Sequence, residues 1–383
     1  MKKIISIILA IALTVLTIGT NVLAESEQIS SNGYLIYNNK SHGIKWTYDR
    51  SKTLTITNIP KEDVSKYPTK QFSDEKMEKY DYYGYSNYGG YSLSENFFDY
   101  LNYNIDRIVY SKGVSMSDFR AIDIDVSFIC FNGQSGVLGC LGYNSMYEID
   151  VSNFSEIGPS ALEGNYNLKK INSSKIKIFD ENCMSHCGLE KINLVSAEAL
   201  ENAAFMYCYK LKKIKFGKHL KTIGEKSFSG TAIKKITIPN SVIKIGSQAF
   251  EGCKKLKYVN IGNKVKTLSG TFANCSNLEK IVLGTNIKDI NDFEGGSWWT
   301  RDFITAFQNC KKLSSVVLKN KKKAPKISER TFENTKNGIK FYVKNKKVAK
   351  GLKKNLKGSG VKKAKIYIGK KLIYKNITDK CGF

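Results

Sequence analysis

An apolar pattern of about 22 residues recurs through the middle of the sequence and restricts the chain to an elongated, repetitive fold. Each unit opens with Leu-x-x-Ile-x-Ile or a close variant, continues through a segment such as Val-x-x-Ile-Gly, and ends with Ala-Phe-x-x-Cys or a variant of it. The openings are Met146, Leu168, Leu189, Leu211, Ile233, Leu256 and Leu278, which gives steps of 22, 21, 22, 22, 23 and 22 residues. Because one unit of this size cannot bury its own apolar face, neighbouring units must stack around a shared core.

The opening segment of each unit predicts a β-strand, since it is short, alternates apolar and polar positions and is rich in β-branched residues. The next segment returns the chain behind that strand, and its glycine is expected to allow a tight bend. A period near 22 falls within the leucine-rich-repeat range. The predicted fold class is therefore α/β, as a leucine-rich-repeat solenoid with a curved parallel β-sheet, mainly β with short turns and helices. Eight or nine units would form a rod about 40 Å long.

Residues 245–256, Ile-Gly-Ser-Gln-Ala-Phe-Glu-Gly-Cys-Lys-Lys-Leu, resemble the repeat of BspA-type bacterial leucine-rich-repeat surface proteins. Residues 44–56 are similar to the β-hairpin that often precedes such arrays, and residues 339–343 are like the strand that often ends them. The resemblance covers about two thirds of the chain. It implies an exported protein of binding type, with adhesion to host or microbial surfaces as the best-known role. The inserted stretch between Leu278 and Leu313 and the lysine content depart from the family pattern and leave the partner open.

The sequence predicts four segments. Residues 1–24 combine a basic start, an apolar run and small residues before Glu25, which is typical of a secretory signal peptide. The apolar run of about 15 residues is shorter than the roughly 20 that span a bilayer, so no transmembrane anchor is expected after cleavage. Residues 25–104 are expected to form an N-terminal cap with a β-hairpin, residues 105–343 the repeat array with an insertion at 291–305, and residues 344–383 a basic C-terminal cap. Within the last segment, the pattern predicts a short amphipathic helix around Val348 to Leu356 and a two-stranded hairpin over 365–374.

The nine cysteines occupy positions that favour free thiols over disulfides. Cys208, Cys253, Cys275 and Cys310 each follow a Phe by three residues and precede a Leu by three. Cysteine that recurs in phase behaves as a small apolar core residue. The redox state of Cys130, Cys140, Cys183, Cys187 and Cys381 is left open. A zinc site or thiol pair at residues 183–187, Cys-Met-Ser-His-Cys, is the less favoured alternative because this cluster falls on the same phase of the repeat.

Lysine dominates the charge of the chain. Lys and Arg total 61 against 34 Asp and Glu, which gives +27, and the residues from Lys319 onward carry +19 of that excess. The third and fifth residues of each predicted strand point away from the core. The candidate ligand-binding residues on this concave face are Lys170, Lys191, Lys213, Lys215, Lys235, Tyr258 and Lys280. Two interpretations stay open, a merely solvated lysine face and an electropositive surface for a polyanion.

Two aromatic regions are further candidates. Trp298 and Trp299 lie in the insertion, and surface loops of this kind often carry function, although the two rings could equally fold the loop onto the solenoid. Residues 66–104 are rich in Tyr and Gly, and they either cover the end of the solenoid or present rings to a partner.

No catalytic motif, cofactor site or metal site is predicted. Three scattered histidines are too few for the usual metal-ligand spacings, and neither a nucleophile elbow nor a phosphate-binding loop is present. The sequence predicts an exported, non-catalytic binding protein, secreted or associated with the cell surface. Its expected partner is an anionic glycan or polymer, or a protein, on a cell surface or wall, and no specific nucleic acid is expected. The alternatives are a cell-wall hydrolase or glycosidase with a site within residues 60–145, since two carboxylates suffice, and a structural surface-layer component.

Overall fold

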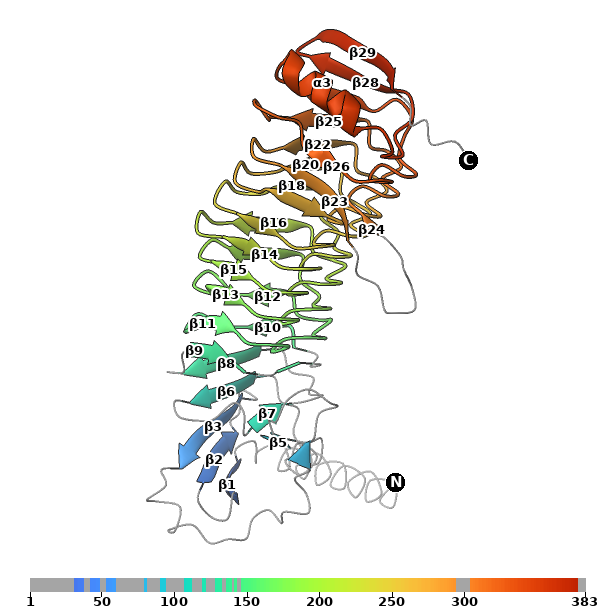
Figure 1. Ribbon diagram of the computed structural model, residues 1–383. Coiled ribbons are helices and arrows are strands. Elements are labelled where there is room, and N and C mark those ends of the chain that lie inside the picture. The colour runs from blue at the N-terminus through green and yellow to red at the C-terminus, as the bar shows by residue number, and fades with distance from the viewer. Residues whose placement is uncertain are drawn as a thin grey trace, which may run out of the picture.

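In a computed structural model the chain forms a β-solenoid whose turns stack along one long axis (Figure 1). The structure describes residues 146–293 and 304–377 throughout, together with residues 31–37, 42–48, 53–59, 79–80, 90–93, 107–111, 119–121, 128–132, 136–139 and 141–142. The predicted signal peptide, both tryptophans of the insertion and nearly all of the Tyr/Gly-rich stretch lie outside these residues. In the part of the chain that is described, no helix has the length and apolar character to cross a membrane.

The first strand of every turn joins one row of side-by-side strands. The row contains β1 (Ser31–Tyr37), β2 (His42–Tyr48), β3 (Thr53–Ile59), β6 (Arg107–Ser111), β8 (Phe128–Asn132), β10 (Glu148–Ile149), β12 (Lys170–Ile171), β14 (Lys191–Leu194), β16 (Lys213–Phe216), β18 (Lys235–Thr237), β20 (Tyr258–Asn260), β22 (Lys280–Leu283), β25 (Ser315–Leu318), β27 (Lys340–Val343), β28 (Ala364–Ile368) and β29 (Lys371–Ile377). From β3 to β28 all hydrogen-bonded pairs in this row are parallel. The strands lie where Leu-x-x-Ile-x-Ile predicts them, and Ile236, Val259 and Ile281 share one register.

The return segment forms a second row of parallel strands, which the sequence pattern did not predict. This second row contains β9 (Gly136–Leu138), β11 (Phe154–Ile157), β13 (Ile178–Phe179), β15 (Ala199–Leu200), β17 (Thr222–Ile223), β19 (Lys244–Ile245), β21 (Thr267–Ser269), β23 (Asp289–Phe293) and β26 (Lys326–Ile327). A separate small sheet joins β4 (Lys79–Tyr80), β5 (Gly90–Leu93) and β7 (Phe119–Ala121). On the third side of each turn the main chain bonds directly to the next turn, as Phe250 N does to Thr271 O at 3.0 Å.

The glycine after the second strand has a different role from the tight bend that the sequence suggested. A Cβ on Gly224 would lie 2.5 Å from the carbonyl carbon of Glu201, and one on Gly246 would lie 2.5 Å from that of Gly224. Both distances are too short for any side chain. Glycine is therefore needed here because successive turns approach each other closely at this point.

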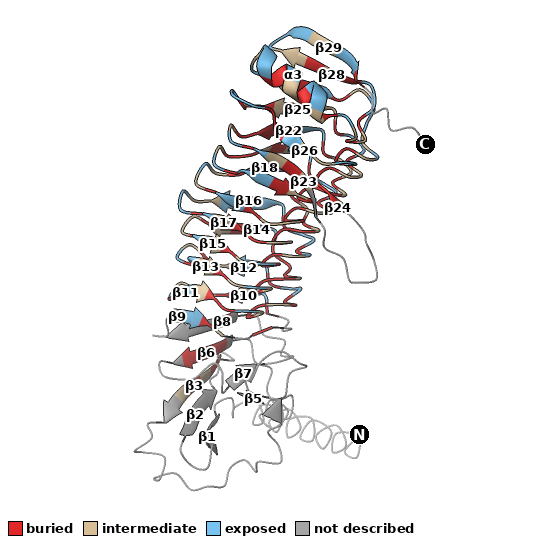
Figure 2. Cartoon of the chain, viewed as in Figure 1, coloured by how far each residue is buried: buried red, intermediate tan, exposed pale blue. Residues whose placement is uncertain are grey.

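Buried residues recur in turn after turn along the solenoid (Figure 2), and their apolar side chains form one core cluster. Its most regular feature is a stack of phenylalanine rings, with centroids 5.4–6.0 Å apart, formed by Phe205, Phe228, Phe250, Phe272, Phe307 and Phe332. Aromatic pairs of this kind add about 0.5–1.5 kcal/mol each beyond the burial of their area. The stack therefore fixes each turn on the one before it.

The four in-phase cysteines are buried and free, as predicted. Each thiol also donates a hydrogen bond to a main-chain carbonyl of the preceding turn, for example Cys275 Sγ to Phe250 O at 3.1 Å. Cys183 and Cys187 are buried and free as well, and their thiols bond to turns on opposite sides, at Ala204 O and Leu162 O. Among the residues described, no three His, Cys, Asp or Glu side chains are grouped so that they could hold a metal. The side chains of Cys130, Cys140 and Cys381 are not among those described.

The insertion leaves and re-enters the solenoid through a short antiparallel ribbon of β23 and β24 (Ile304–Thr305). Phe272 and Phe307 are 35 residues apart in sequence, against 22 for Phe250 and Phe272, yet their rings stack like the others. The phenylalanine stack therefore continues unbroken across the insertion.

The predicted C-terminal helix and hairpin are both present. The helix α3 spans Lys346–Asn355, and Asn345 caps it by accepting a hydrogen bond from Val348 N at 2.9 Å. Val348, Ala349 and Leu352 are buried against the last turns. The strands β28 and β29 pair antiparallel after the helix. That these elements act as a cap remains a prediction.

Candidate binding surface

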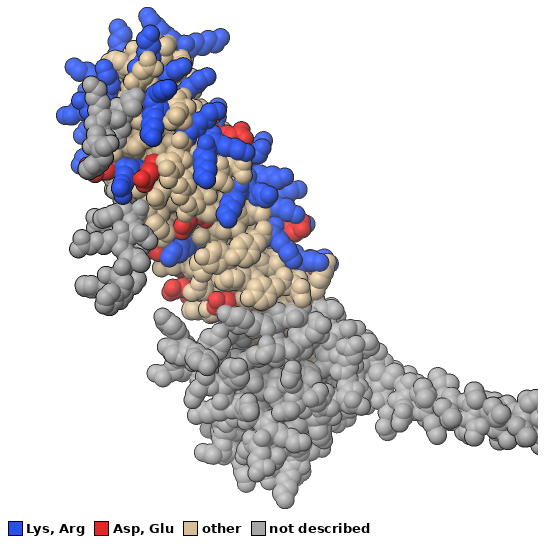
Figure 3. All heavy atoms as spheres, turned by 90° about the vertical axis from the view of Figure 1, so that its right-hand side faces the viewer, with Lys and Arg blue, Asp and Glu red and all other residues tan. Residues whose placement is uncertain are grey.

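The candidate lysines lie on the exposed side of the first strand row, in register from turn to turn. Lys191 lies beside Lys213, and a second line runs through Lys235, Tyr258, Lys280, Ser315, Lys340 and Lys365. The lysines predicted as ligand contacts are all exposed, while Tyr258 is half-buried. Lys340 and Lys365 were missed because Gly338 and Lys363 stand where the unit-opening leucine is expected. Figure 3 shows basic side chains along the solenoid towards its C-terminal end, with few acidic ones between them.

Ion pairs distinguish Lys170 and several lysines near the candidate positions from the remaining candidates. Four lysines each meet a carboxylate in a neighbouring turn, at distances of 2.9–3.6 Å: Lys170 with Glu148, Lys177 with Glu198, Lys212 with Glu190 and Lys257 with Glu279. Within the described ranges no carboxylate lies within 4.0 Å of Lys191, Lys213, Lys215, Lys235 or Lys280. We call these five unpaired residues the lysine face. Lys170 was predicted to belong to it but has its own carboxylate partner.

An exposed group of aromatic rings, which sequence reasoning missed, lies at the corner where the third side of the turn meets the first strand row. We define this aromatic corner as Tyr147, Tyr166, His186, Tyr207 and Tyr209. Ring contacts link the last four, and Tyr147 is an exposed ring beside Lys169. The tyrosines are 38–64 % exposed. The centroids of His186 and Tyr207 are 5.2 Å apart, and the stacked rings of Tyr207 and Tyr209 are 5.6 Å apart.

The aromatic corner adjoins the first strand row. The amines of Lys169 and Lys170 lie over the ring of Tyr147, at 5.1 and 5.4 Å from its centroid. Tyr209 comes four residues before Lys213 of the lysine face. Amines and an aromatic ring therefore meet at Tyr147, at the edge of the first strand row.

The backbone of the aromatic corner is strained. The residue before the cysteine position adopts a left-handed conformation in successive turns, with φ of 54–73°: His186, Tyr207, Gly230, Gly252, Asn274, Asn309 and Asn334. Gly and Asn adopt this conformation readily, whereas other residues are disfavoured by about 1–2 kcal/mol. His186 and Tyr207 depart from this pattern, and their position in the repeat is the sequence signal by which they could have been found. The same conformation recurs at a second position of the turns, at Ala203, Lys226, Gln248 and Arg330. Left-handed backbone is therefore general to this repeat, and His186 and Tyr207 are distinguished by the rings that they carry there.

Comparisons with known proteins agree with this architecture. The sequence profile described as BspA type leucine rich repeat region matches in six copies over residues 139–208, 198–294 and 304–377, which together make up 230 of the 383 residues. A search of curated proteins gave no significant match.

Three of the solved structures similar to this chain are described as leucine-rich-repeat or leucine-rich proteins. One from Bacteroides ovatus is 17 % identical with a TM-score of 0.45, covering 85 % of this chain and 98 % of its own. One from Eubacterium ventriosum is 20 % identical with a TM-score of 0.37, covering 80 % and 90 %. A leucine rich cell surface protein from Faecalibacterium prausnitzii is 14 % identical with a TM-score of 0.33, covering 78 % and 92 %.

Proposed function

Since the chain belongs to the BspA-type leucine-rich-repeat family, we propose that it is a non-catalytic binding protein that recognises an anionic glycan on a cell surface or wall. The observation that carries the proposal is the lysine face, whose exposed amines have no carboxylate partner among the described residues. The aromatic corner is close to it in sequence, since Tyr209 comes four residues before Lys213. The proposed place of action is outside the cell, as the pattern of residues 1–24 predicts.

The lysine face supports binding of a polymer rather than of a single ion. Lys191 and Lys213 are held in register on adjacent strands, and such strands lie about 4.8 Å apart. Like charges this close destabilise a sheet unless something offsets them. A polyanion laid along the row would offset the repulsion and release bound counterions, which favours association at low salt.

The aromatic corner favours a glycan over the other anionic partners, an acidic protein or a phosphate polymer of the wall. Tyrosine rings are rigid and amphipathic, with apolar faces and a polar hydroxyl. Their exposed faces suit the flat C–H surfaces of sugar rings, and their hydroxyls suit the sugar hydroxyls. A polymer without sugar rings would use the amines alone.

The two alternatives make different demands on the chain. The candidate hydrolase site in residues 60–145 lies mostly outside the described residues. A structural surface-layer component needs no ligand, and the like charges of Lys191 and Lys213 on adjacent strands would only destabilise it.

The test compares polyanions that differ in backbone but not in charge sign, with neutral dextran as an uncharged control. The full chain is titrated with heparin, hyaluronate, polyglutamate, polyphosphate and neutral dextran at several salt concentrations. We expect the two anionic glycans to bind more tightly than polyglutamate or polyphosphate, dextran to bind weakly, and glycan affinity to fall as salt rises. Equal or tighter binding of polyglutamate would show that charge alone is recognised. No binding of any polyanion would overturn the proposal.

A further inference from the structure

The loop between the two strand rows is longer in one turn than in its neighbours. Ile290 of the second row follows Leu283 of the first row by seven positions, whereas Ile327 follows Leu318 by nine. Both ends are nevertheless in register, since Leu283 pairs with Leu318 and Ile290 with Ile327. The two extra residues must therefore bulge outward. Ala324 is buried at the position that Ile287 occupies one turn earlier, and its smaller side chain fills less of the interior there.

Three asparagines fix the longer loop in place. Asn320 Nδ2 donates to Ile287 O at 2.7 Å, which ties the loop to the preceding turn. From the other side, Asn345 Nδ2 donates to Lys321 O at 2.8 Å and Asn355 Nδ2 donates to Pro325 O at 2.7 Å. These two asparagines flank α3 at its two ends, so the helix holds the loop at both of its ends. A loop fixed in this way loses little conformational entropy when a ligand binds.

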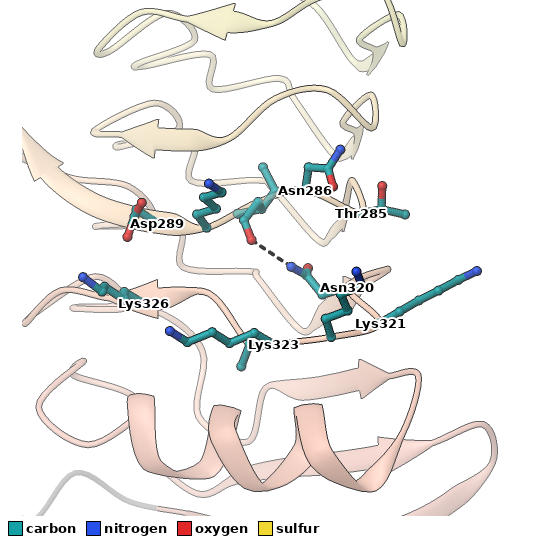
Figure 4. A pocket seen from close by; sticks show the side chains of 11 residues that line it. Thr285, Asn286, Asp289, Asn320, Lys321, Lys323 and Lys326 are labelled. Atoms are coloured by element: carbon teal, nitrogen blue, oxygen red, sulfur yellow. Dashed lines mark hydrogen bonds between the residues drawn. The ribbon is translucent and has the colours of Figure 1, made fainter.

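A pocket of about 600 Å³ lies between this loop and the one before it (Figure 4). Sites for small molecules occupy about 300–1,000 Å³, so the size fits one. Five of its lining residues are lysines: Lys288, Lys321, Lys322, Lys323 and Lys326. Asp289 is the single acidic residue that lines it, and it lies beside Lys326 in the second row.

Asn320 adds a neutral polar group to this basic pocket. Its side chain is only 6 % exposed, and while Nδ2 bonds to Ile287 O, Oδ1 has no hydrogen-bond partner in the described structure. A buried acceptor without a donor is costly, and a ligand that supplies a donor removes that cost. The pocket therefore combines cations with one acceptor that remains to be paired.

We propose that this pocket binds a single sugar unit that carries an anionic group, a phosphate or a carboxylate. The anionic group contacts the lysines, and a sugar hydroxyl donates to Asn320 Oδ1. Charge-assisted hydrogen bonds supply affinity, and the hydroxyl contact supplies selectivity. The site lies on the edge of the first strand row opposite to the aromatic corner, and it goes beyond the proposed function because it takes one unit and needs no polymer.

Calorimetric titration of the full chain with glucose 1-phosphate, glucuronate, glucose and sulfate tests the proposal. We expect the first two to bind, with the tighter one identifying the anionic group, and glucose to bind weakly. The variant K321Q/K322Q/K323Q should lose at least about tenfold in affinity, or roughly 1.4 kcal/mol. The matched variant K350Q/K354Q/K357Q removes the same charge from exposed positions on and just after α3, outside the pocket, and should stay within about twofold of wild type. Equal losses in both variants, or no binding of either sugar anion at millimolar concentration, would overturn the proposal.

Asn320→Ala separates hydroxyl recognition from simple anion binding. Sulfate has no hydroxyl to donate, so this variant should weaken glucose 1-phosphate and leave sulfate affinity unchanged. If both weaken equally, Asn320 only holds the loop and the hydroxyl contact is wrong. Failure here is distinct from failure of the proposed function, because substitutions on the lysine face should leave binding of the sugar anions intact.

Discussion

The amine of Lys170 lies 2.9 Å from the carboxylate of Glu148, at the same position of the preceding turn. The hydrogen bond to Glu148 and its negative charge raise the pKa of Lys170. The next lysines of that position, Lys191 and Lys213, lie beside each other, and no carboxylate of the described residues lies within 4.0 Å of either amine. The change from a paired to an unpaired lysine marks where the candidate binding face begins.

Removing the unpaired lysines should therefore affect polyanion binding more than removing the paired ones. In K191Q/K213Q/K235Q/K280Q we expect the log–log dependence of heparin affinity on salt to flatten by about 0.7–0.9 for each lysine that binds an anionic group of heparin in the wild type. The control K170Q/K177Q/K212Q/K257Q removes the same charge from lysines that have carboxylate partners, and its slope should change little. Affinity measured over a salt series checks this. Identical slopes in the two variants would mean that only net charge matters.

His186 and Tyr207 should lower the stability of the fold while raising its affinity for a glycan. In H186N/Y207N the left-handed positions carry a residue that tolerates them, so we expect the free energy of unfolding to rise by about 1 kcal/mol, after allowance for the ring packing that the substitutions remove. Glycan affinity should fall in the same variant. Thermal denaturation and glycan titration provide the two measurements.

Gly252→Ala is the reverse control for that experiment. An added Cβ there meets only Gly230 N, at 4.0 Å, and the φ of Gly252 is 65°. The free energy of unfolding of the Gly252→Ala variant should therefore fall by about 1 kcal/mol from backbone strain alone. If H186N/Y207N is instead less stable than wild type, the two rings stabilise the fold, and the expected cost of His186 and Tyr207 to stability is wrong.

The buried thiols should be inert until the chain unfolds. Burial raises the pKa of Cys208 to about 12, and it raises the pKa values of Cys183 and Cys187 well above the ordinary range. At about pH 8, near the ordinary thiol pKa, iodoacetamide should leave these cysteines unmodified in the native chain and alkylate them in denaturant. Peptide mapping by mass spectrometry reads each site separately. A disulfide at any of these sites would contradict the free-thiol prediction.

The same pKa shift predicts a loss of stability in alkali. The folded state keeps the Cys208 thiol protonated while the unfolded state releases the proton above its pKa of about 8.5. The stabilising contribution is therefore complete below that pH and is lost as pH rises towards 12, by up to about 1.4 kcal/mol per pH unit. Cys208→Ala should be less stable than wild type at neutral pH, and the difference should narrow between about pH 9 and pH 11. A difference that stays constant over this range would show that the thiol does not titrate on unfolding.

The N-cap residue Asn345 should stabilise both α3 and the loop that it holds. Asn345→Ala removes the bond from Val348 N and the bond to Lys321 O, so we expect it to destabilise the C-terminal segment by about 1–2 kcal/mol. Hydrogen exchange over residues 346–355 measures this locally. Asn337→Ala, at an exposed position before β27, should change stability by no more than about 0.5 kcal/mol. Unchanged exchange in Asn345→Ala would show that the cap contributes nothing to docking.

The repeat alone predicted much of the fold. Leu256 opens the unit that lies between those opened by Ile233 and Leu278. The spacing of 22 or 23 residues therefore determines which strands are neighbours and which residues share a register. The buried, free state of Cys275 follows from the same phase. The second strand row was missed because two-residue strands such as Lys244–Ile245 are too short to show an alternating pattern.

The sequence by itself determined the periodic properties of this protein: the strands, the core columns and the outward direction of the lysines. Those properties depend on apolar spacing, which every turn repeats, so one turn predicts the next. Only the tertiary structure decided that Lys170 is paired while Lys191 is not, that His186 and Tyr207 meet at 5.2 Å, and that the loop around Asn320 leaves a pocket. These features depend on single side chains from different turns that meet across the stack, and no repeat pattern encodes such individual contacts.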